Sequence, residues 1–535
     1  MKRIIILISI IILALIFCIS CMEQAETSVH TDSEVSMGTN DADAVYTVIY
    51  NDAPNGKIVG ETKQFVRRGE SASEVKAVAD KGYVFVMWSD GVKNATRRDS
   101  FITQNITVSP VFATEDTKDL LDIGIPVINI YTESKQEITS KETYIKCSVS
   151  VSGTLEEYCF EGASAQIRGR GNTSWSYYPK KSYRIKFDFK RSMMGSDYKA
   201  KDWTLISNYG DKSLSRNAIA HELAKRFDSI AFASMNQFVE VYLNGEYNGL
   251  YLLCDQIETG RGRVEVSEKW AADGDTGYLI EMDKRATQED VDYFEMENDV
   301  GHYYRLKTPD SSDENYDPSI YLAYIKNYME NAMYAINDIK EWEEICSYID
   351  VDSFAEAYII FEIMANLDCH SFSFYMYKEQ GGKLYCGPVW DFDISSGNNN
   401  YGYDQEDGTI VDAVPDLDLQ VYGELWAAKQ NRWFRRLLRI PEFETLVAQK
   451  LEKYEDTIND VISLLETDGS NKNSYYSVYG EAIDRNFERW DIMGEYIWPN
   501  TQTLVDITTA KGQIDYLHEW LTQRHKIVRN RFGLQ

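Results

Sequence analysis

Alternation of apolar and polar residues dominates the segment 46–114 and predicts a small β module. Alternating runs that end in a turn or a polar stretch cover 46–50, 61–66, 83–88 and 106–112. Residues 73–79 interrupt this series, and we predict a short helix there. The module is therefore expected to be a domain of its own over 46–114.

From residue 125 onward, strand-like and helix-like patterns mix, and beyond residue 437 only the helical pattern remains. Apolar residues recur there at steps of three and four in the stretches 443–464, 479–490 and 511–532. The fold class predicted is α+β. It consists of the small N-terminal β module, a mixed α/β core over 125–435, and a helical C-terminal part of the same domain over 436–535.

The first twenty residues have the pattern of a secretory signal peptide. Lys2 and Arg3 precede an apolar run over 4–19 that is short for a transmembrane helix, and the small residue Ser20 follows it. The segment Cys18-Ile19-Ser20-Cys21 resembles a lipobox, which implies lipidation of Cys21 and a membrane-anchored lipoprotein of the cell envelope. The alternative is an ordinary signal peptide over 1–20 that ends near a cysteine. Polar residues without periodicity over 21–45 predict a flexible tether.

The charge balance argues against nucleic acid as a partner. Lys and Arg number 55 against 85 Asp and Glu, a net charge of −30, whereas nucleic-acid phosphates require a basic face. Of the eight cysteines, two belong to the signal region, and the other six show no C-x-x-C spacing, which argues against zinc. A disulfide between Cys147 and Cys159 is an alternative to free thiols.

One predicted hairpin should bring three carboxylates together. Its strands cover 372–378 and 383–386, with Asp368 before the first and Asp391 and Asp393 after the second. Because a hairpin brings its two ends side by side, these residues should converge, although 391 − 368 = 23 positions separate the outer pair. Clustered carboxylates repel one another unless a proton or a divalent cation relieves them.

Protein kinases place their catalytic base and a metal-binding Asp around a hairpin in the same way. The alternative is an acidic loop that caps a helix or is solvated. Upstream, Ser353 to Glu356 has the form of a capping box and predicts the start of a helix that leads toward Asn366.

Six motifs in order surround these carboxylates. They are 167–175 with the basic strand 179–186, then 203–217, 238–251, 277–283, Asn366-Leu367-Asp368, and Gly387-Pro388-Val389-Trp390-Asp391-Phe392-Asp393. Together they resemble the CotH family of atypical, spore-coat-type protein kinases. The resemblance implies an atypical-kinase-like fold for the mixed domain, with ATP and Mg²⁺ (or Mn²⁺) as cofactors.

The resemblance also implies roles for the acidic residues: Asp368 as the base, Asp391 as the main metal ligand and Asp393 as an assisting ligand. Many family members carry an Asn four or five positions after the catalytic Asp, where this chain has Phe372 and Ser373. Ser373 is then the candidate for a weaker second metal ligand, and a degenerate site is the alternative.

Phosphate is expected at the densest group of cations in the chain, which comprises Arg168, Arg170, Lys180, Lys181, Arg184 and Lys186. Gly169 and Gly171 would let backbone N–H groups approach the phosphate. Alternation along the strand puts Lys181 on its core-side face and Lys180 and Lys186 on the other, which leaves open which lysine reaches the nucleotide. A solvated basic strand edge is the alternative. Glu240 and Asp255 are candidate partners for such a lysine.

Residues 79–91 and 108–113 resemble an internalin-B-type bacterial repeat, present in one copy, and a spacer is favoured over a binding module. Two functions stay open. One is an exported kinase that phosphorylates Ser or Thr of a surface or exported protein, and the other is a non-catalytic surface scaffold or adhesin. Asp368 and Asp391 favour the enzyme; Ser373 and the scarcity of ATP outside the cytoplasm favour the scaffold.

Overall fold

The computed structural model describes residues 44–534 apart from 54, 89–91, 93, 101, 103–104, 115–124, 155–157, 195, 197, 268, 290, 401, 404–409 and 412–430. The predicted signal peptide over 1–20, the lipidation site Cys21 and the tether up to residue 43 lie outside the described residues. No helix within the described ranges is long and apolar enough to cross a membrane.

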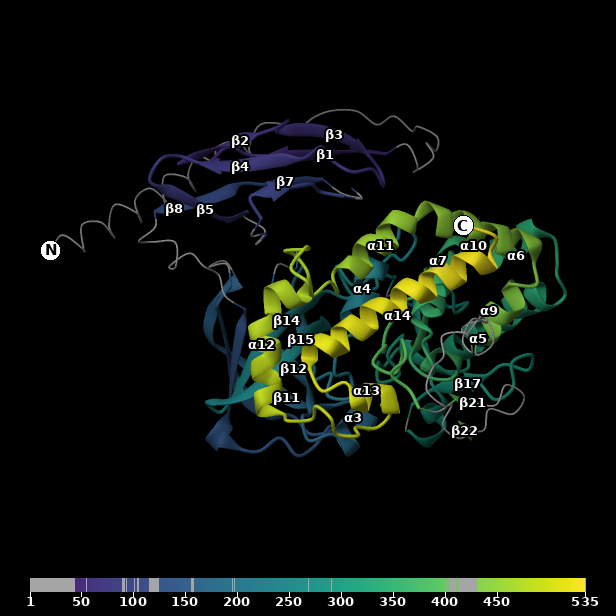
Figure 1. The fold of residues 1–535 in the computed structure, drawn as a ribbon. Helices are drawn as coiled ribbons and strands as arrows, with labels where there is room; N and C mark the ends of the chain where they lie inside the picture. The colour runs from purple at the N-terminus through teal and green to yellow at the C-terminus, as the bar shows by residue number, and fades with distance from the viewer. Residues whose placement is uncertain are drawn as a thin grey trace, which may run out of the picture. The chain divides into compact units, whose positions relative to one another are not determined.

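Residues 45–114 form the predicted β module, the purple part of Figure 1. Its strands are β1 (Val45–Tyr50), β2 (Gly56–Val59), β3 (Lys63–Arg67), β4 (Val75–Ala79), β5 (Tyr83–Trp88), β6 (Thr96–Arg97), β7 (Ile106–Val108) and β8 (Pro110–Thr114). They form three small sheets, ordered β3-β1-β7, β2-β4-β6 and β5-β8. The module has its own core, which contains Tyr50 and Trp88.

The helix predicted over 73–79 is wrong, because this segment contains strand β4. Val75 and Ala77 are buried in the module core, whereas Lys76 between them is exposed. Pairing with β2 and β6 satisfies the backbone of β4 on both sides. Period-two burial therefore overrides the local helical tendency.

Seven strands of the main domain close into a barrel in the order β10-β11-β12-β13-β15-β14-β9. They are β9 (Val127–Thr132), β10 (Ile145–Ser152), β11 (Phe160–Arg170), β12 (Ser182–Arg191), β13 (Ala200–Ile206), β14 (Asn236–Leu243) and β15 (Glu246–Asp255). The neighbours Ile167, Ile185 and Trp203 on β11, β12 and β13 form a fully buried row. This row fills the barrel as the alternation of the sequence predicts.

A second sheet has the order β17-β18-β16-β19-β20 and is antiparallel throughout. Its strands are β16 (Tyr278–Met282), β17 (Tyr293–Glu295), β18 (Tyr303–Thr308), β19 (Phe374–Lys378) and β20 (Leu384–Cys386). Two helices lie between barrel strands in the sequence, α3 (Thr173–Tyr177) and α4 (Arg216–Arg226). Three more lie between β18 and β19 of the second sheet: α5 (Tyr321–Asn337), α6 (Trp342–Tyr348) and α7 (Val351–Met364). The short elements are η2 (Glu133–Lys135), η4 (Lys284–Gln288), η5 (Asp368–His370), β21 (Gly402–Tyr403) and β22 (Ile410–Val411).

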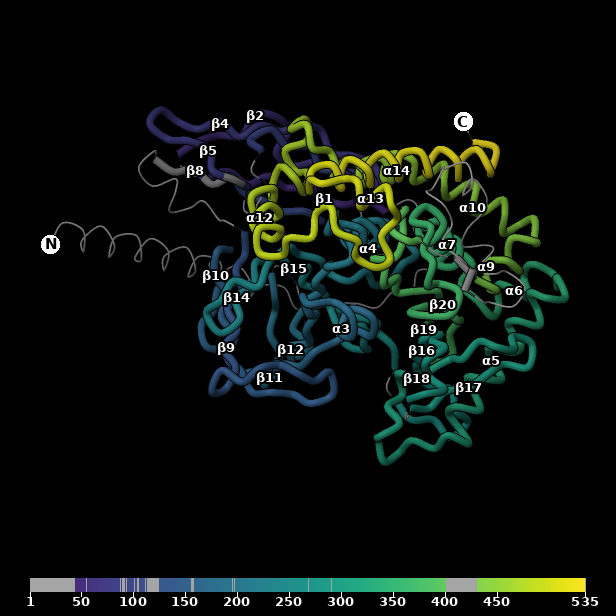
Figure 2. Tube along the Cα trace, turned by 60° about the horizontal axis from the view of Figure 1, so that its bottom comes forward, coloured from purple at the N-terminus to yellow at the C-terminus, as the bar shows by residue number. Residues whose placement is uncertain are grey.

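The C-terminal part is helical, as predicted, and its helices pack on the barrel and on α7. It consists of α9 (Arg432–Leu437), α10 (Pro441–Lys453), α11 (Glu455–Ser463), α12 (Tyr475–Arg489), α13 (Gln502–Asp506) and α14 (Ala510–Arg531). Helix α12 packs on β15 of the barrel, and α14 packs on α7 (Figure 2). The prediction of an α+β protein with a β module and a helical C-terminal part is confirmed.

The stretch 443–464 is helical, as predicted, and is divided into α10 and α11 because the backbone of Tyr454 leaves the helical region, with ψ 9°. One local prediction, the capping box at Ser353, is wrong. Helix α7 begins at Val351, where Asp350 accepts a hydrogen bond from the Ser353 N–H, so the capping box at Ser353 does not form. Its acidic member, Glu356, is fully buried and bonds Ser229 and Lys450 of other elements instead.

Candidate functional site

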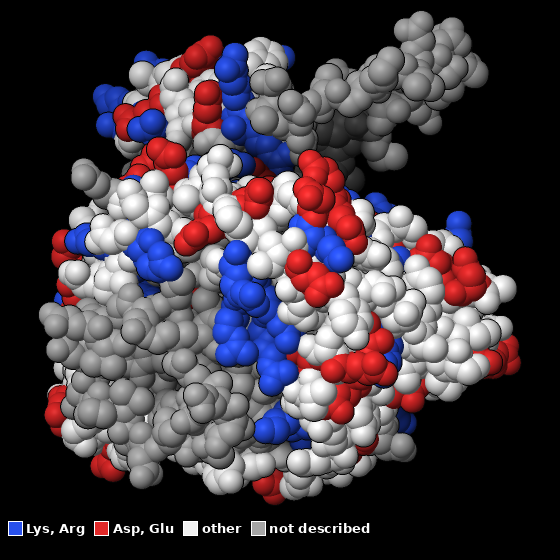
Figure 3. Space-filling model, turned by 90° about the vertical axis from the view of Figure 1, so that its right-hand side faces the viewer, with Lys and Arg blue, Asp and Glu red and all other residues white. Residues whose placement is uncertain are grey.

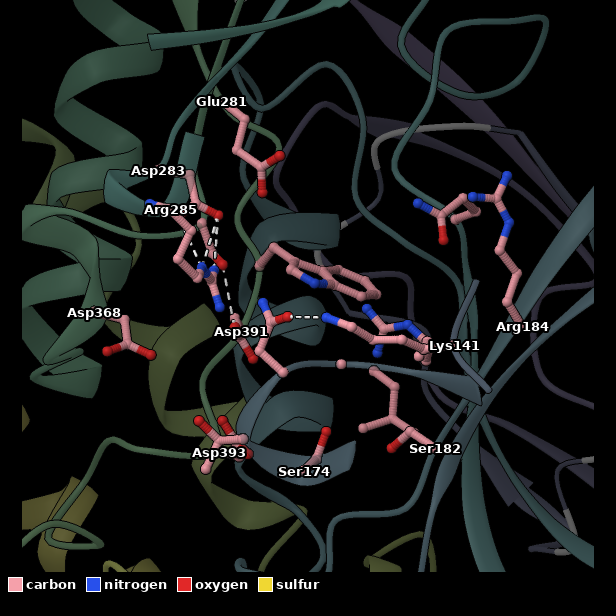
Figure 4. A pocket seen from close by; sticks show the side chains of 18 of the residues that line it. Lys141, Ser174, Ser182, Arg184, Glu281, Asp283, Arg285, Asp368, Asp391 and Asp393 are labelled. Atoms are coloured by element: carbon pink, nitrogen blue, oxygen red, sulfur yellow. Dashed lines mark hydrogen bonds and ion pairs between the residues drawn. The ribbon is translucent and has the colours of Figure 1, made fainter. Parts of the chain in front are cut away.

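A cavity of about 680 Å³ lies between one end of the barrel and the second sheet (Figure 4). The barrel side contributes cations, among them Arg168 and Arg170 from β11. The sheet side contributes Asp368, Asp391 and Asp393. Charges of opposite sign therefore face each other across the cavity.

The hairpin of β19 and β20 places the three carboxylates as its geometry predicts. Met376 pairs with Cys386, and the Gly387 N–H donates to the carbonyl of Tyr375 at 2.9 Å, which closes the hairpin immediately before Asp391. Asp368 lies in η5, just before β19. Both ends of the hairpin thus reach the same cavity.

The backbone at Asp391 adopts a left-handed conformation, with φ 68°, which is uncommon for a residue other than glycine. Two buried amides hold it. The Asn366 Nδ2 donates to the Asp391 carbonyl at 2.8 Å, and the Asn217 Oδ1 accepts from the Phe392 N–H at 2.7 Å. Strain of this kind persists only where surrounding contacts enforce it, and here it aims Asp391 into the cavity.

Burial and mutual repulsion raise the proton affinity of two of these carboxyls. Burial first, and then the charge of Asp391, raise the pKa of Asp368 to about 7. The same two causes, with Asp368 adding to the repulsion, raise the pKa of Asp393 well above its usual range. The guanidinium of Arg285 acts in the opposite direction and lowers the pKa of Asp368.

Asp391, Asp393 and Ser373 all line the cavity, and the Ser373 Oγ donates to the Asp391 Oδ2 at 3.1 Å. Within the described ranges no three His, Cys, Asp or Glu side chains gather into a complete metal centre. Mg²⁺ does not require such a cage, because it binds through one or two carboxylates, water and the phosphates of a substrate. Two carboxylates and a hydroxyl beside an open cavity fit that ion.

On the barrel side, three cations have no ion-pair partner among the residues that the structure describes: Lys141, Arg168 and Arg170. The Lys141 Nζ donates to the Asn172 Oδ1 at 2.6 Å, and the Arg168 Nη1 donates to the Lys141 carbonyl. Arg170 lies over the ring of Trp390 at 5.5 Å, and burial lowers its pKa against the attraction of Asp391. An anionic ligand would supply the missing counter-charge.

The two glycines of the turn have different surroundings. Gly171 lines the cavity with φ 89°, where an L side chain is strained. Gly169 does not line it, and its N–H already donates to the Ser140 carbonyl at 2.9 Å. A Cβ on Gly169 would meet the Trp175 ring at 2.1 Å, so the close packing of that ring explains this glycine.

None of the three lysines proposed for phosphate, Lys180, Lys181 and Lys186, lines this cavity. Lys180 is 1% exposed and donates to the Ser207 carbonyl, the Leu250 carbonyl and the Asn486 Oδ1 at 2.6–2.8 Å. Burial lowers the pKa of Lys180, yet three acceptors require all three N–H groups of an ammonium, and we infer the charged form from this geometry.

The other two lysines also lie elsewhere. Lys181 donates to the Trp175 carbonyl at 2.5 Å, and Lys186 is exposed on β12. Their proposed carboxylate partners bind arginines instead: Glu240 pairs with Arg485 at 2.9 Å, and Asp255 with Arg263 at 2.9 Å. The cysteines proposed as a disulfide, Cys147 and Cys159, are both free.

The sequence prediction missed the cations of the sheet side. The Arg285 side chain donates three hydrogen bonds to Asp283, at 2.7, 2.8 and 3.1 Å, and points toward Asp391 (Figure 4). Lys307 pairs with Glu281 at 3.4 Å. Glu281 on β16 and Asp283 just after it line the cavity, and so does Arg285, which lies in the short helix η4 that Asp283 caps. Asp283 stands in the motif 277–283, and its neighbour Arg285 is the cation that this motif could have indicated.

Comparison with known families agrees with both resemblances. The family described as CotH kinase protein matches residues 167–528, and the divergent InlB B-repeat domain matches residues 46–116. The search of curated proteins gave no significant match. The first match covers more than half of the 535 residues and includes every residue of the acidic cluster. This chain belongs to the CotH kinase protein family.

Proposed function

We propose that this protein transfers a phosphoryl group from ATP, with Mg²⁺ or Mn²⁺, to a Ser or Thr hydroxyl of a surface or exported protein. The observation that carries the proposal is the distribution of charge in the cavity. Lys141, Arg168 and Arg170 on one side lack counter-ions among the described residues, and so do Asp368, Asp391 and Asp393 on the other.

Charges of opposite sign on the walls of one cavity attract each other and gain energy by forming direct ion pairs. Among the described residues no ion pair joins the three cations to the three aspartates, although Arg170 lies near enough to Asp391 for their charges to attract. A ligand that completes such a cavity carries negative charge toward the arginines and positive charge toward the aspartates. A nucleotide with its divalent cation has this arrangement of charge.

The barrel side would hold the phosphates. Arg170 is buried and lies close to Asp391, so it is the cation best placed to reach the transferred group. Arg168 and Lys141 would bind the remaining oxygens, because both present N–H donors at the cavity wall. Gly171 lets the backbone turn away from this surface without a side chain.

Asp391 and Asp393 would hold the divalent cation, with Ser373 beside them. When bound, that cation neutralises charge on the phosphate oxygens. Asp368 would accept the proton of the attacking hydroxyl, and its raised pKa of about 7 suits a general base near neutral pH. The proton would leave the hydroxyl oxygen as that oxygen forms its bond to the γ-phosphorus, while the bond from this phosphorus to the β–γ bridging oxygen breaks and ADP leaves.

The direct test is incubation of the purified full-length protein with γ-labelled ATP, Mg²⁺ or Mn²⁺, and extracts of exported proteins. Label is expected on Ser or Thr with the wild-type protein and not with Asp368→Asn. Binding of a fluorescent nucleotide, measured separately, should persist in Asp368→Asn. Absence of both labelling and nucleotide binding in the wild-type protein would contradict the proposal.

We further propose that the protein acts outside the cytoplasm, held at the membrane by a lipid on Cys21. The charged start, apolar run and small residue before Cys21 support this proposal. Cys21→Ala is expected to release the protein into the soluble fraction or to stall its processing. Normal processing with unchanged membrane association would contradict the lipid anchor.

A second function, a surface scaffold without turnover, has one specific observation in its favour. Ser373 offers a hydroxyl, already donated to Asp391, where many family members have an amide side chain. The repeat module fits a scaffold as well as an enzyme. Nucleotide binding without any transfer would favour this function.

A further inference from the structure

Helix α9 carries a stripe of arginines along one side. Arg432, Arg435 and Arg436 lie in α9 and Arg439 in the turn that follows it, at the spacing i, i+3, i+4, i+7 of one helical face. We call these four residues the arginine stripe of α9. The opposite face, with Trp433, Phe434 and Leu437, is buried in the main core. A compact basic group stands out on the side of the molecule shown in Figure 3, the side on which α9 lies in Figure 1.

These arginines are poorly neutralised. Arg432 and Arg436 share a single carboxylate, Asp299, at 3.3 and 3.5 Å. His302 also contacts Asp299, at 3.4 Å. Arg435 and Arg439 are exposed, and neither has an ion pair among the residues that the structure describes.

The repulsion between these arginines affects Arg436, which is half-buried. Burial lowers the pKa of Arg436, and the like charges of Arg432 and Arg435 lower it further, although the carboxylate of Asp299 raises it. The Arg436 Nη1 accordingly has no hydrogen-bond acceptor. Like charges three and four positions apart destabilise a helix, whereas Arg435 and Arg436 in the last turn gain from the helix dipole, so the stripe as a whole adds little to stability.

The end of α14 shows how the same protein neutralises basic residues elsewhere. Arg524, Arg529 and Arg531 pair with Glu362, Glu455 and Glu444, respectively. In a chain of net charge −30, carboxylates are abundant, yet within the described ranges α9 pairs with Asp299 alone.

The stripe is held rigidly beside the loop that contains Asp368. Asn431 caps α9 by accepting from the N–H groups of Trp433 and Phe434, and its Nδ2 donates to the Cys369 carbonyl at 2.7 Å. Cys369 directly follows Asp368. A partner bound at α9 would therefore lie next to the loop of the proposed base.

We propose that the arginine stripe of α9 is a docking surface for a protein segment with closely spaced Asp and Glu side chains, because Asp299 shows that a carboxylate binds two of these arginines at once. Guanidinium groups bind carboxylate and phosphate through paired N–H donors, which suits arginine better than lysine for this contact. The identification of this partner as the phosphate acceptor rests on the proposed function; the docking itself does not.

The test uses the full-length protein without nucleotide and three fluorescent peptides of one scaffold sequence. One carries four Glu, one has Gln at the same positions, and one has phosphoserine there. Anisotropy titrations are made at low and at high salt. The Glu peptide should bind, weaken as salt rises, and lose at least tenfold in affinity with Arg435→Glu/Arg439→Glu, while the Gln peptide should not bind. Binding of the phosphoserine peptide alone would overturn the proposal.

A matched control changes the net charge equally at exposed lysines on other elements, Lys472→Glu/Lys526→Glu, and should bind like the wild-type protein. Arg435→Gln/Arg439→Gln gives a second variant with less repulsion, and thermal melting verifies the fold of each. Equal losses in both double-Glu variants, or equal binding of the Gln peptide, would overturn the proposal. Anionic phospholipid vesicles are titrated in the same way. Binding to these vesicles without binding to the Glu peptide would also overturn the proposal, because the stripe would then be a membrane contact.

A wild-type protein that binds a peptide but transfers no phosphate would refute the proposed function and leave the docking surface standing. A wild-type protein that transfers phosphate but does not bind the Glu peptide would refute the docking surface and leave the proposed function standing. The two proposals therefore fail separately.

Discussion

The two sides of the cavity are built in different ways. On the barrel side, Arg168 and Arg184 are cross-strand neighbours on β11 and β12, placed by regular antiparallel pairing. Arg184 is neutralised by Asp202 at 2.8 Å, and Arg168 is left for a ligand. On the sheet side, the carboxylates stand on loops, and Asp391 needs a strained backbone to reach the cavity.

This difference indicates a division of labour. Regular strands hold charge in a rigid position, which suits the binding of phosphate. Loops beside a hairpin bring together groups that repel one another, which suits a site that must take up a cation and move a proton. We expect changes on the sheet side to affect turnover and metal dependence, and changes on the barrel side to affect affinity.

The largest effect is expected from Asp368→Asn. Removal of the proposed base should lower phosphoryl transfer by roughly 10²–10⁴-fold, because Asn cannot accept the hydroxyl proton. Nucleotide affinity should stay close to that of the wild-type protein, which a fluorescence titration would show. A variant as active as the wild-type protein would remove Asp368 from the mechanism.

Asp391→Asn should next separate metal binding from structure. Asn tolerates the left-handed backbone at this position, so the fold should be kept. Without ligand the variant should melt no lower than the wild-type protein, because one repelling charge is lost. With Mg²⁺ and ATP at 100 times the dissociation constant, the wild-type protein should gain about 2.7 kcal/mol, and the variant little.

Differential scanning calorimetry with and without Mg²⁺–ATP measures both effects, and the wild-type melting temperature should rise by roughly 2–4 °C. If Asp391 is instead a purely structural carboxylate, the variant melts lower in both conditions and nucleotide shifts neither protein. That result would also favour the scaffold function.

On the barrel side, Arg170→Met should weaken nucleotide binding by roughly 10–100-fold, because a charge-assisted contact to phosphate is lost. Arg184→Met is the matched control, since it breaks the pair with Asp202 and should lower stability more than affinity. Lys180→Met should likewise change melting rather than binding, because its three acceptors are structural. Nucleotide titration and melting of all three variants distinguish the cases; equal affinity in Arg170→Met would contradict our assignment of the phosphate site.

The smallest effect concerns pH. Asp368 has a raised pKa of about 7 in the folded protein, so its contribution to stability is complete below the unfolded value near 4 and is lost as pH rises through 7. The free energy of unfolding of the metal-free wild-type protein should therefore fall, relative to Asp368→Asn, by roughly 1–2 kcal/mol between pH 5 and 7. Urea denaturation at both pH values measures this difference, and parallel curves for the two proteins would show that Asp368 titrates normally.

Local patterning was sufficient wherever two neighbouring elements decide the geometry. The hairpin pattern after Asp368 predicted that Asp391 and Asp393 lie near Asp368, because two antiparallel strands bring the start of the first beside the end of the second. The filling of the barrel by alternate residues of β12 was equally readable. The six ordered motifs indicated the family, which the comparison confirmed.

Patterning failed where distant segments compete for one group. The segment 73–79 was compatible with a helix or a strand, and pairing with β2 and β6 makes it a strand. Lys180 and Arg170 belong to the same basic cluster in sequence, yet Asn486 of α12, more than three hundred positions away, helps to bury one of them while the other stays in the cavity. The charge of a residue can be read from the chain, but its partner cannot.

The family, the fold class and the convergence of the three aspartates can be inferred from the order of amino acids alone, since they depend on ordered motifs, local periodicity and a single hairpin. Which cations lack a counter-ion becomes apparent only in the folded chain. That outcome depends on which carboxylates and carbonyls pack around each one, and burial makes those contacts strong. Arg170, Arg435 and Arg439 became candidates for function for this reason.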